Sequence, residues 1–296
     1  MSRGSNFALL LYKMTSIKIG GVDEHFNLPW HLLWESGRLD ELEIDLQWID
    51  CLGGTGEMTK LLREGDLDMA VLLTEGIVMD ILNESPSRIL KVFVQSSLEW
   101  GVHVASDSDK DLRLEDRLTY AISREGSGSH LMALVYAKEK GISINRMNFV
   151  EVGSLAGALR AFEKKEVDVF FWEKFTTDPH CTSKKLKRID TIPTPWPCFM
   201  IAVNSSFYKK NIGAVEELVS EVLKEAAQFK KNEQAPKIVA ERYGLTVERA
   251  EKWFDSVLWG AGQNLSLAEI NRVVKELQLL GKVEAGVEPM VSNILV

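Results

Sequence analysis

The sequence predicts an α/β fold in two lobes, each built on a parallel β-sheet covered by helices. Short apolar segments alternate with amphipathic helical segments, and this alternation occurs twice along the 296 residues. Such alternation is typical of parallel sheets with right-handed crossovers. Two further extended segments, near residues 100–105 and 195–200, are expected to carry the chain between the lobes. We therefore expect a two-lobed fold with a hinged cleft between the lobes and helices at the C-terminus.

The individual elements follow from apolar periodicity and from turn and capping residues. In the first repeat, strands are expected at 16–22, 43–49 and 67–73, and helices begin near residues 30, 57 and 74. In the second repeat, strands 118–122 and 147–152 lead to helices 129–140 and 154–164, while strand 167–171 leads to a loop. Further strands are expected at 88–95, 188–192 and 199–203, and C-terminal helices at 212–230, 233–243, 246–257 and 266–279.

These elements divide the chain into two lobes. Residues 14–103 and 199–296 are expected to form lobe 1, which is discontinuous in sequence, and residues 104–198 are expected to form lobe 2. Met14 resembles a second start, so residues 1–13 are interpreted as an N-terminal extension. Proline-rich residues 193–197 are expected to stiffen the second crossing between the lobes.

Composition limits the classes of partner. The net charge of −8 disfavours binding to nucleic acid or to anionic membranes, and no apolar run approaches a membrane span. The three cysteines, Cys51, Cys181 and Cys198, are scattered and lack metal-ligand spacing, so we expect no disulfide framework, metal or cofactor. The sequence as given contains no export signal, which predicts a cytoplasmic location, or a periplasmic one if a signal was trimmed. The oligomeric state is left open.

The segment Ser123–Tyr136 contains the clearest candidate for a binding site. A short apolar strand runs into Gly126-Ser-Gly-Ser129, and a helix follows directly. A turn of this kind directs backbone N–H groups toward one point at the positive end of the helix dipole, where anions bind. The alternative is that these residues only form the turn and cap the helix. Other loops between strands and helices, including Gly53–Gly56 with Gly54 and Thr55, are expected at the same edge.

Two segments carry a resemblance to a known family. Residues 53–70 combine a Gly/Ser turn, a helix and a Leu-x-x-Gly-x-x-Asp-x-Ala ending, and residues 152–169 repeat this pattern. With Gly126-Ser-Gly-Ser129, they resemble the type 2 periplasmic-binding proteins, in the branch of sulfonate, taurine and nitrate receptors and thiamine-pyrimidine proteins. The resemblance covers about residues 16–260, through organisation more than identity.

The resemblance implies a two-lobed solute receptor that closes on a small molecule. Ser127, Gly128 and Ser129 match the family's anion-holding turn. Thr74, Glu75 and Gly76 match the facing turn of the first lobe. The loop after the first strand, with His25, Asn27 and Trp30, contacts ligand in many members.

Other candidates each have a plainer interpretation. Trp172 and Trp196 can stack on a planar ligand or belong to the core, and Trp30 more often belongs to the core. Glu173 can accept a hydrogen bond from a ligand amine or remain a solvated carboxylate, and His130 can donate to an anion or face solvent.

Three functional hypotheses remain open. The first is a non-catalytic receptor for a small anionic or heteroaromatic metabolite, with a transporter as partner if the protein is exported. The second is an enzyme of thiamine-pyrimidine biosynthesis on the same scaffold, although that enzyme's cysteine-rich run is missing. The third is an interaction module that uses its C-terminal helices. Because no catalytic motif is recognisable and no catalytic residue can be named, a receptor is favoured over an enzyme.

Overall fold

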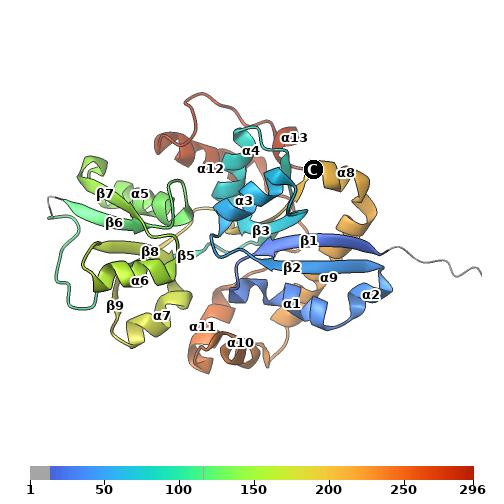
Figure 1. Ribbon diagram of the computed structural model, residues 1–296, viewed down its shortest axis with the longest axis horizontal. Coiled ribbons are helices and arrows are strands. Elements are labelled where there is room, and N and C mark those ends of the chain that lie inside the picture. The colour runs from blue at the N-terminus through green and yellow to red at the C-terminus, as the bar shows by residue number, and fades with distance from the viewer. Residues whose placement is uncertain (1–13, 116) are drawn as a thin grey trace, which may run out of the picture.

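The computed structural model describes residues 14–115 and 117–296, so the extension expected at 1–13 lies outside the described residues. The described chain forms two five-stranded sheets that lie side by side, each with helices on its two faces (Figure 1). We call the unit around each sheet the first and the second lobe. The expected two-lobed α/β fold is therefore confirmed.

The sheet of the first lobe has the order β2-β1-β3-β10-β4. Strand β1 pairs in parallel with β2 and β3, whereas β10 inserts antiparallel between β3 and β4. The strands are β1 (Thr15–Gly21), β2 (Ile44–Asp50), β3 (Met69–Leu73), β4 (Ser87–Val94) and β10 (Phe199–Asn204).

The sheet of the second lobe repeats this arrangement in the order β7-β6-β8-β5-β9. Strand β6 pairs in parallel with β7 and β8, and β5 is antiparallel to both β8 and β9. The strands are β5 (Glu99–Ala105), β6 (Leu118–Ile122), β7 (Met147–Glu151), β8 (Val169–Glu173) and β9 (Leu186–Pro193).

The helices cover these sheets from both sides. In the first lobe, α1 packs with α9 below the sheet, while α3, α4 and α12 lie above it (Figure 1). The first-lobe helices are η1 (His25–Asn27), α1 (Leu28–Glu35), α2 (Arg38–Glu41), α3 (Thr55–Glu64), α4 (Thr74–Leu82) and α8 (Ser205–Lys210). The C-terminal helices are α9 (Ile212–Lys230), α10 (Ala235–Tyr243), α11 (Val247–Ser256), α12 (Leu267–Leu279) and α13 (Val291–Ile294). The second lobe contains α5 (Gly128–Lys140), η2 (Ile144–Arg146), α6 (Leu155–Glu163) and α7 (Lys174–Thr182).

Two segments connect the lobes, 95–98 and 194–198, and they are hydrogen-bonded to each other. The backbone N–H of Thr194 donates to the carbonyl of Leu98 at 2.9 Å, and the Thr194 hydroxyl accepts from the backbone N–H of Leu98 at 3.0 Å. Strand β5 pairs along its length within the second sheet, so the first crossing precedes residue 99. This corrects the boundary expected at residue 103.

Several helices differ from the expectation: the short helices α2, α8 and α13 were not predicted, and α7 replaces a predicted loop. The segment after β8 is a helix, α7, although the sequence predicts a loop there. Glu173 caps this helix by accepting a hydrogen bond from the backbone N–H of Thr176, and Pro179 lies inside it. A proline near the middle of a nine-residue segment argues against a helix, and the cap offsets part of that penalty.

Apolar contacts continue from one lobe to the other. The largest core cluster contains Ile17 of the first sheet, Leu98 at the crossing and Phe171 of the second sheet. Within the described part of the chain, no helix combines the length and apolar character needed to cross a bilayer.

Candidate functional site

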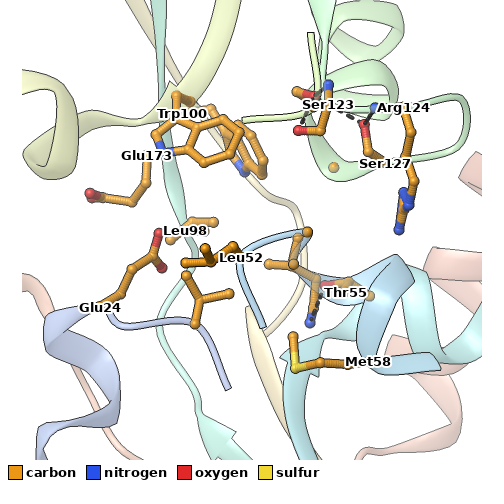
Figure 2. Close-up of a pocket in the computed structure, with 18 of the residues that line it drawn as sticks. Glu24, Leu52, Thr55, Met58, Leu98, Trp100, Ser123, Arg124, Ser127 and Glu173 are labelled. Carbon is orange, nitrogen blue, oxygen red and sulfur yellow. Dashed lines mark hydrogen bonds between the residues drawn. The ribbon is translucent and has the colours of Figure 1, made fainter. Parts of the chain in front are cut away.

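A cavity of about 80 Å³ lies between the two lobes and is lined by both (Figure 2). Its walls come from the turns that follow β1, β2 and β6 and from the ends of β3 and β8. A second cavity of about 270 Å³ adjoins it, since Thr55, Leu73, Arg124 and Ser127 line both. We call the two cavities together the cleft. Strand ends and helix N-termini therefore meet here, as at the ligand sites of other open α/β sheets.

The turn between β6 and α5 offers backbone donors to the cleft. Its hydroxyls are already engaged, because Ser127 Oγ accepts from the backbone N–H of His130 at 3.4 Å and Ser129 Oγ accepts from that of Ser123 at 2.9 Å. The backbone N–H groups of Gly128 and Ser129 make no hydrogen bond within the described chain. These two donors, at the positive end of a helix dipole, are available to an anion.

Arg124 adds a full positive charge to the same turn. It lines both cavities, and no described carboxylate lies within ion-pair distance of it: the adjacent Glu125 pairs with Lys282 at 3.1 Å, and Glu151 acts on Arg124 only from a longer distance. Its guanidinium lies against Gly56 in the first turn of α3, where an added methyl group would overlap it. Burial lowers the pKa of Arg124, but an arginine starts so far above neutrality that it keeps its charge.

The first lobe contributes a second helix N-terminus, that of α3. Gly54 adopts φ 64°, a left-handed conformation that favours glycine and turns the chain into the helix. The Thr55 hydroxyl accepts from the backbone N–H of Leu73 at 3.1 Å and fixes this turn against the end of β3. Figure 2 shows Thr55 and Ser127 on opposite sides of the pocket. Two positive helix ends therefore face one space.

Carboxyl groups occupy the other end of the cavity. Glu24 lies in the loop after β1, and Glu173 ends β8 with only 3% of its surface exposed. Desolvation raises the pKa of Glu24 to about 8, with a further contribution from the Glu173 charge, and raises that of Glu173 to about 7. His25 Nε2 is 4.0 Å from Glu173 Oε2, but burial lowers the pKa of His25 to about 3. The histidine is therefore neutral and does not offset these carboxylates.

Two tryptophans cover the space between the ends. Trp100 on β5 is paired with Glu173 in the sheet register, and Trp172 is paired with Gly101, so the two indoles belong to neighbouring strands. Both line the cavity. Their Nε1 atoms are buried and have no hydrogen-bond partner.

The structure brings many of the sequence-predicted site residues together. Those that line the first cavity are Gly54, Thr55, Ser127, Gly128, Ser129, Trp172 and Glu173. Those that line the second are Thr55, Glu75, Gly76, Ser127 and Gly128. The turn of the second lobe thus faces Glu75 and Gly76 of the first lobe across this cavity.

The other predicted residues lie behind the cleft, which corrects the expectation that they line it. Trp30 is fully buried and packs between Trp48 and Phe93 in the core, because α1 turns its apolar side to the sheet. His25 packs edge-on against Trp253, with ring centroids 4.4 Å apart.

Local hydrogen bonds hold the remaining predicted site residues in place. Asn27 Nδ2 donates to the carbonyl of Val22 at 2.8 Å, and His130 Nδ1 accepts from the backbone N–H of Gly126 at 3.0 Å. Thr74 and Trp196 are each held at the second crossing: the Thr74 hydroxyl donates to the carbonyl of Pro197, and Trp196 Nε1 donates to Glu75 Oε2 at 2.9 Å. The sequence does not reveal these hydrogen-bond partners, because the chain brings them together only when it folds.

Several lining residues were not singled out from the sequence. Glu24 and Arg124 fall within the expected loops, but a charged loop residue is normally solvated, so nothing marked them as special. Trp100 lies on β5, directly after the first crossing segment. Apolar residues complete the lining, and they are Val22, Leu52, Met58, Leu73, Leu98 and Phe199. Among the described residues, no group of three or more His, Cys, Asp or Glu side chains is arranged to hold a metal ion.

Comparison with known proteins places this architecture in a recognised class. Residues 100–192, most of the second lobe, match the family model described as Ca3427-like PBP. A comparison with curated proteins found no match. The structure of the Candida albicans CA3427 gene product, described as having the generic periplasmic binding protein fold, is similar with a TM-score of 0.85 at 22% identity, over 92% of each chain.

Two further solved structures are similar at lower identity. The aliphatic sulphonate binding protein SsuA of Escherichia coli gives a TM-score of 0.68 at 13% identity, covering 95% of this chain and 92% of that one. The nitrate-binding protein NrtA of Synechocystis gives 0.73 at 12% identity, covering 93% and 83%. The fold is therefore that of the type 2 periplasmic binding proteins.

Proposed function

We propose that this protein binds a small anionic molecule in the cleft between its lobes. The observation that carries the proposal is the unpaired Arg124 beside the free backbone N–H groups of Gly128 and Ser129, opposite the N-terminus of α3. A half-buried cation without a carboxylate within ion-pair distance is unfavourable, and an anionic ligand supplies the missing charge. Helix N-termini add donors that need no side chain.

The fold supports the same proposal. Similar structures come from proteins described as binding aliphatic sulphonate, nitrate and methylphosphonate, which are all small anions. In this chain the two lobes are joined by two short segments, and such connections permit hinge bending around a ligand. We expect the ligand to be enclosed as the lobes close, with affinity arising from its removal from water.

The test is a thermal-shift and calorimetric titration of the full chain with methanesulfonate, nitrate and methylphosphonate. A ligand present at 100 times its Kd stabilises the folded state by about 2.7 kcal/mol, which is a measurable rise in Tm. The variant Arg124→Met should bind the same anion about 10- to 100-fold more weakly, because a charge-assisted contact is lost.

The matched control is Arg160→Met, since Arg160 is exposed on α6 of the same lobe. This variant removes one positive charge at a distance from the cleft and should keep the wild-type affinity. The proposal fails if none of the three anions stabilises the wild-type protein. The proposal also fails if Arg124→Met, like the control Arg160→Met, binds the anion as tightly as the wild type does.

A further inference from the structure

The cavity between the lobes has two carboxyl groups at one end, one from each lobe. Glu24 lies in the loop after β1 of the first lobe, and Glu173 ends β8 of the second. Figure 2 shows both on the side of the pocket away from Arg124. His25, which follows Glu24 in the chain, brings its Nε2 atom to 4.0 Å from Glu173 Oε2. The two glutamates therefore approach each other across the boundary between the lobes.

This carboxyl pair has no cation beside it in the described part of the chain. No lysine or arginine there lies within ion-pair distance of either glutamate, and Lys174 pairs instead with Glu99. His25 is neutral, because burial lowers its pKa to about 3. The apolar ring of Trp100 lines the same cavity, which excludes much of the surrounding water. Two ionised carboxylates in such surroundings would repel each other and would lack hydration.

The charged groups near the pair add to this repulsion. Asp23 raises the pKa of Glu24, and Asp178 raises that of Glu173, each through its negative charge. The charge of Asp178 is offset in part, since Arg188 lies 2.7 Å from it. The charges that face the pair from its own segments therefore favour a protonated carboxyl group.

The titratable groups from other elements supply no positive charge. Cys198 at the second crossing and Tyr243 of α10 lie near the pair, and burial raises the pKa of each, so both are neutral near pH 7. Glu75, which also acts on Cys198, accepts a hydrogen bond from Trp196 and lines the second cavity. A proton is thus the cation that can relieve the carboxyl pair.

We propose that Glu24 and Glu173 form a proton-operated latch: the lobes stay closed while the pair holds at least one proton, and they open when both carboxyl groups are ionised. Because the two glutamates belong to different lobes, opening separates them and returns them to water. The latch acts on the chain by itself, without a ligand. For its effect on a bound anion, the inference rests on the proposed function.

The direction of the pH effect follows from proton linkage. In the closed form, desolvation raises the pKa of Glu24 to about 8 and that of Glu173 to about 7, whereas hydration in the open form restores values near 4.5. The closed form therefore binds protons that the open form has released. Raising the pH through 7 and 8 shifts the population toward the open form.

Small-angle X-ray scattering of the ligand-free full chain at pH 6 and pH 9 tests the latch, with circular dichroism to show that the chain is folded at both. The wild-type radius of gyration should be larger at pH 9. The double variant Glu24→Gln/Glu173→Gln carries neutral amides at both pH values and should stay compact at both. In Glu173→Gln the amide oxygen can still cap α7. Glu163→Gln, at an exposed position on α6, is the control and should behave as wild type.

A second arm measures the affinity for methanesulfonate and nitrate by calorimetry at the same two pH values. Both anions stay ionised over this range, so any change in affinity comes from the protein. An anion that requires the closed form loses affinity in proportion to the closed fraction. We expect wild type to bind about ten-fold or more weakly at pH 9 than at pH 6, and the double variant to bind equally at both.

The outcomes separate the latch from the proposed function. If the wild-type radius of gyration is the same at both pH values, the latch is wrong, and anion binding is judged by its own titration. If the double variant expands at pH 9 as wild type does, another group such as Glu75 holds the proton and the assignment is wrong. If wild type alone expands but neither anion binds nor stabilises it, the latch stands and the proposed function loses its support.

Discussion

The first and second lobes use the same order of strands, yet the turns after equivalent strands bring different side chains to the cleft. Strand β1 of the first sheet occupies the position of β6 in the second, and the antiparallel strand β10 corresponds to β5. The loop after β1 brings Glu24 to the cleft, whereas the turn after β6 brings Arg124. The shared topology determines where the loops meet, and the side chains on those loops determine what they recognise.

Two glutamates near the ends of corresponding strands extend this comparison. Glu173 is the last residue of β8, and Glu75 is the second residue of α4, the helix that follows the corresponding strand β3. Glu75 is 1% exposed and accepts a hydrogen bond from Trp196 Nε1 at 2.9 Å, which ties it to the crossing segment. Glu173 is held by its own helix and lines the cavity that Trp100 covers. One glutamate therefore anchors the hinge, and the other faces the ligand space.

The largest effect we expect is on stability as a function of pH. Desolvation raises the pKa of Glu75 and of Glu173 from 4.5 to about 7. The folded state then holds protons that the unfolded state has already released, so each group lowers the free energy of unfolding as pH rises from about 4.5 through 7. Between pH 5 and pH 8, the free energy of unfolding of Glu75→Gln and of Glu173→Gln should each rise, relative to that of wild type, by on the order of 1–3 kcal/mol.

Urea unfolding of the ligand-free protein at the two pH values measures this difference. Glu166→Gln, at an exposed position, is the control and should show no such gain. If Glu75→Gln shows the gain and Glu173→Gln does not, the carboxyl group of Glu173 is not desolvated, and the two glutamates differ in their burial.

The next effect concerns the contact between Arg124 and α3. Gly56→Ala places a methyl group where the guanidinium of Arg124 lies, so that flexible side chain must move away. We expect the affinity for the anion to fall about ten-fold, close to 1.4 kcal/mol, through loss of a positioned charge. Stability should be unchanged or slightly raised, since alanine is a better helix former than glycine.

Gly213→Ala is the matched control, because Gly213 is helical and a methyl group there meets nothing within 4 Å. Calorimetry and urea unfolding of both variants separate binding from stability. Wild-type affinity in Gly56→Ala would mean that Arg124 binds the ligand from another position.

Much of the fold can be predicted from the sequence, for a physical reason. Alternating strands and helices close into parallel sheets, and the loops at the carboxyl ends of those strands then meet. This places Thr55, Ser127 and Glu173 at one gap before any coordinates are known. The fold of each lobe depends on local periodicity, which the sequence displays directly.

The charges in the cleft could not be predicted in the same way. Whether Arg124 has a carboxylate partner depends on how closely segments distant from it, such as Glu151 at the end of β7, approach it in the folded chain. Whether Trp30 reaches the cleft depends on the rotation of α1, whose residues are apolar on several sides. Such properties depend on packing between distant segments, so they appear only in the folded chain.

The smallest effect concerns an ion pair that joins the lobes outside the cleft. Lys138 of α5 donates to both carboxylate oxygens of Glu276 on α12, at 2.9 and 3.0 Å. Both side chains are partly exposed, so a double-mutant cycle of Lys138→Met and Glu276→Gln should give a coupling of about 0.2–1 kcal/mol that disappears in 1 M salt. Ligand affinity should change less than about five-fold. A coupling above about 2 kcal/mol that persists in salt would show instead that this surface contact, rather than the cleft, holds the two lobes together.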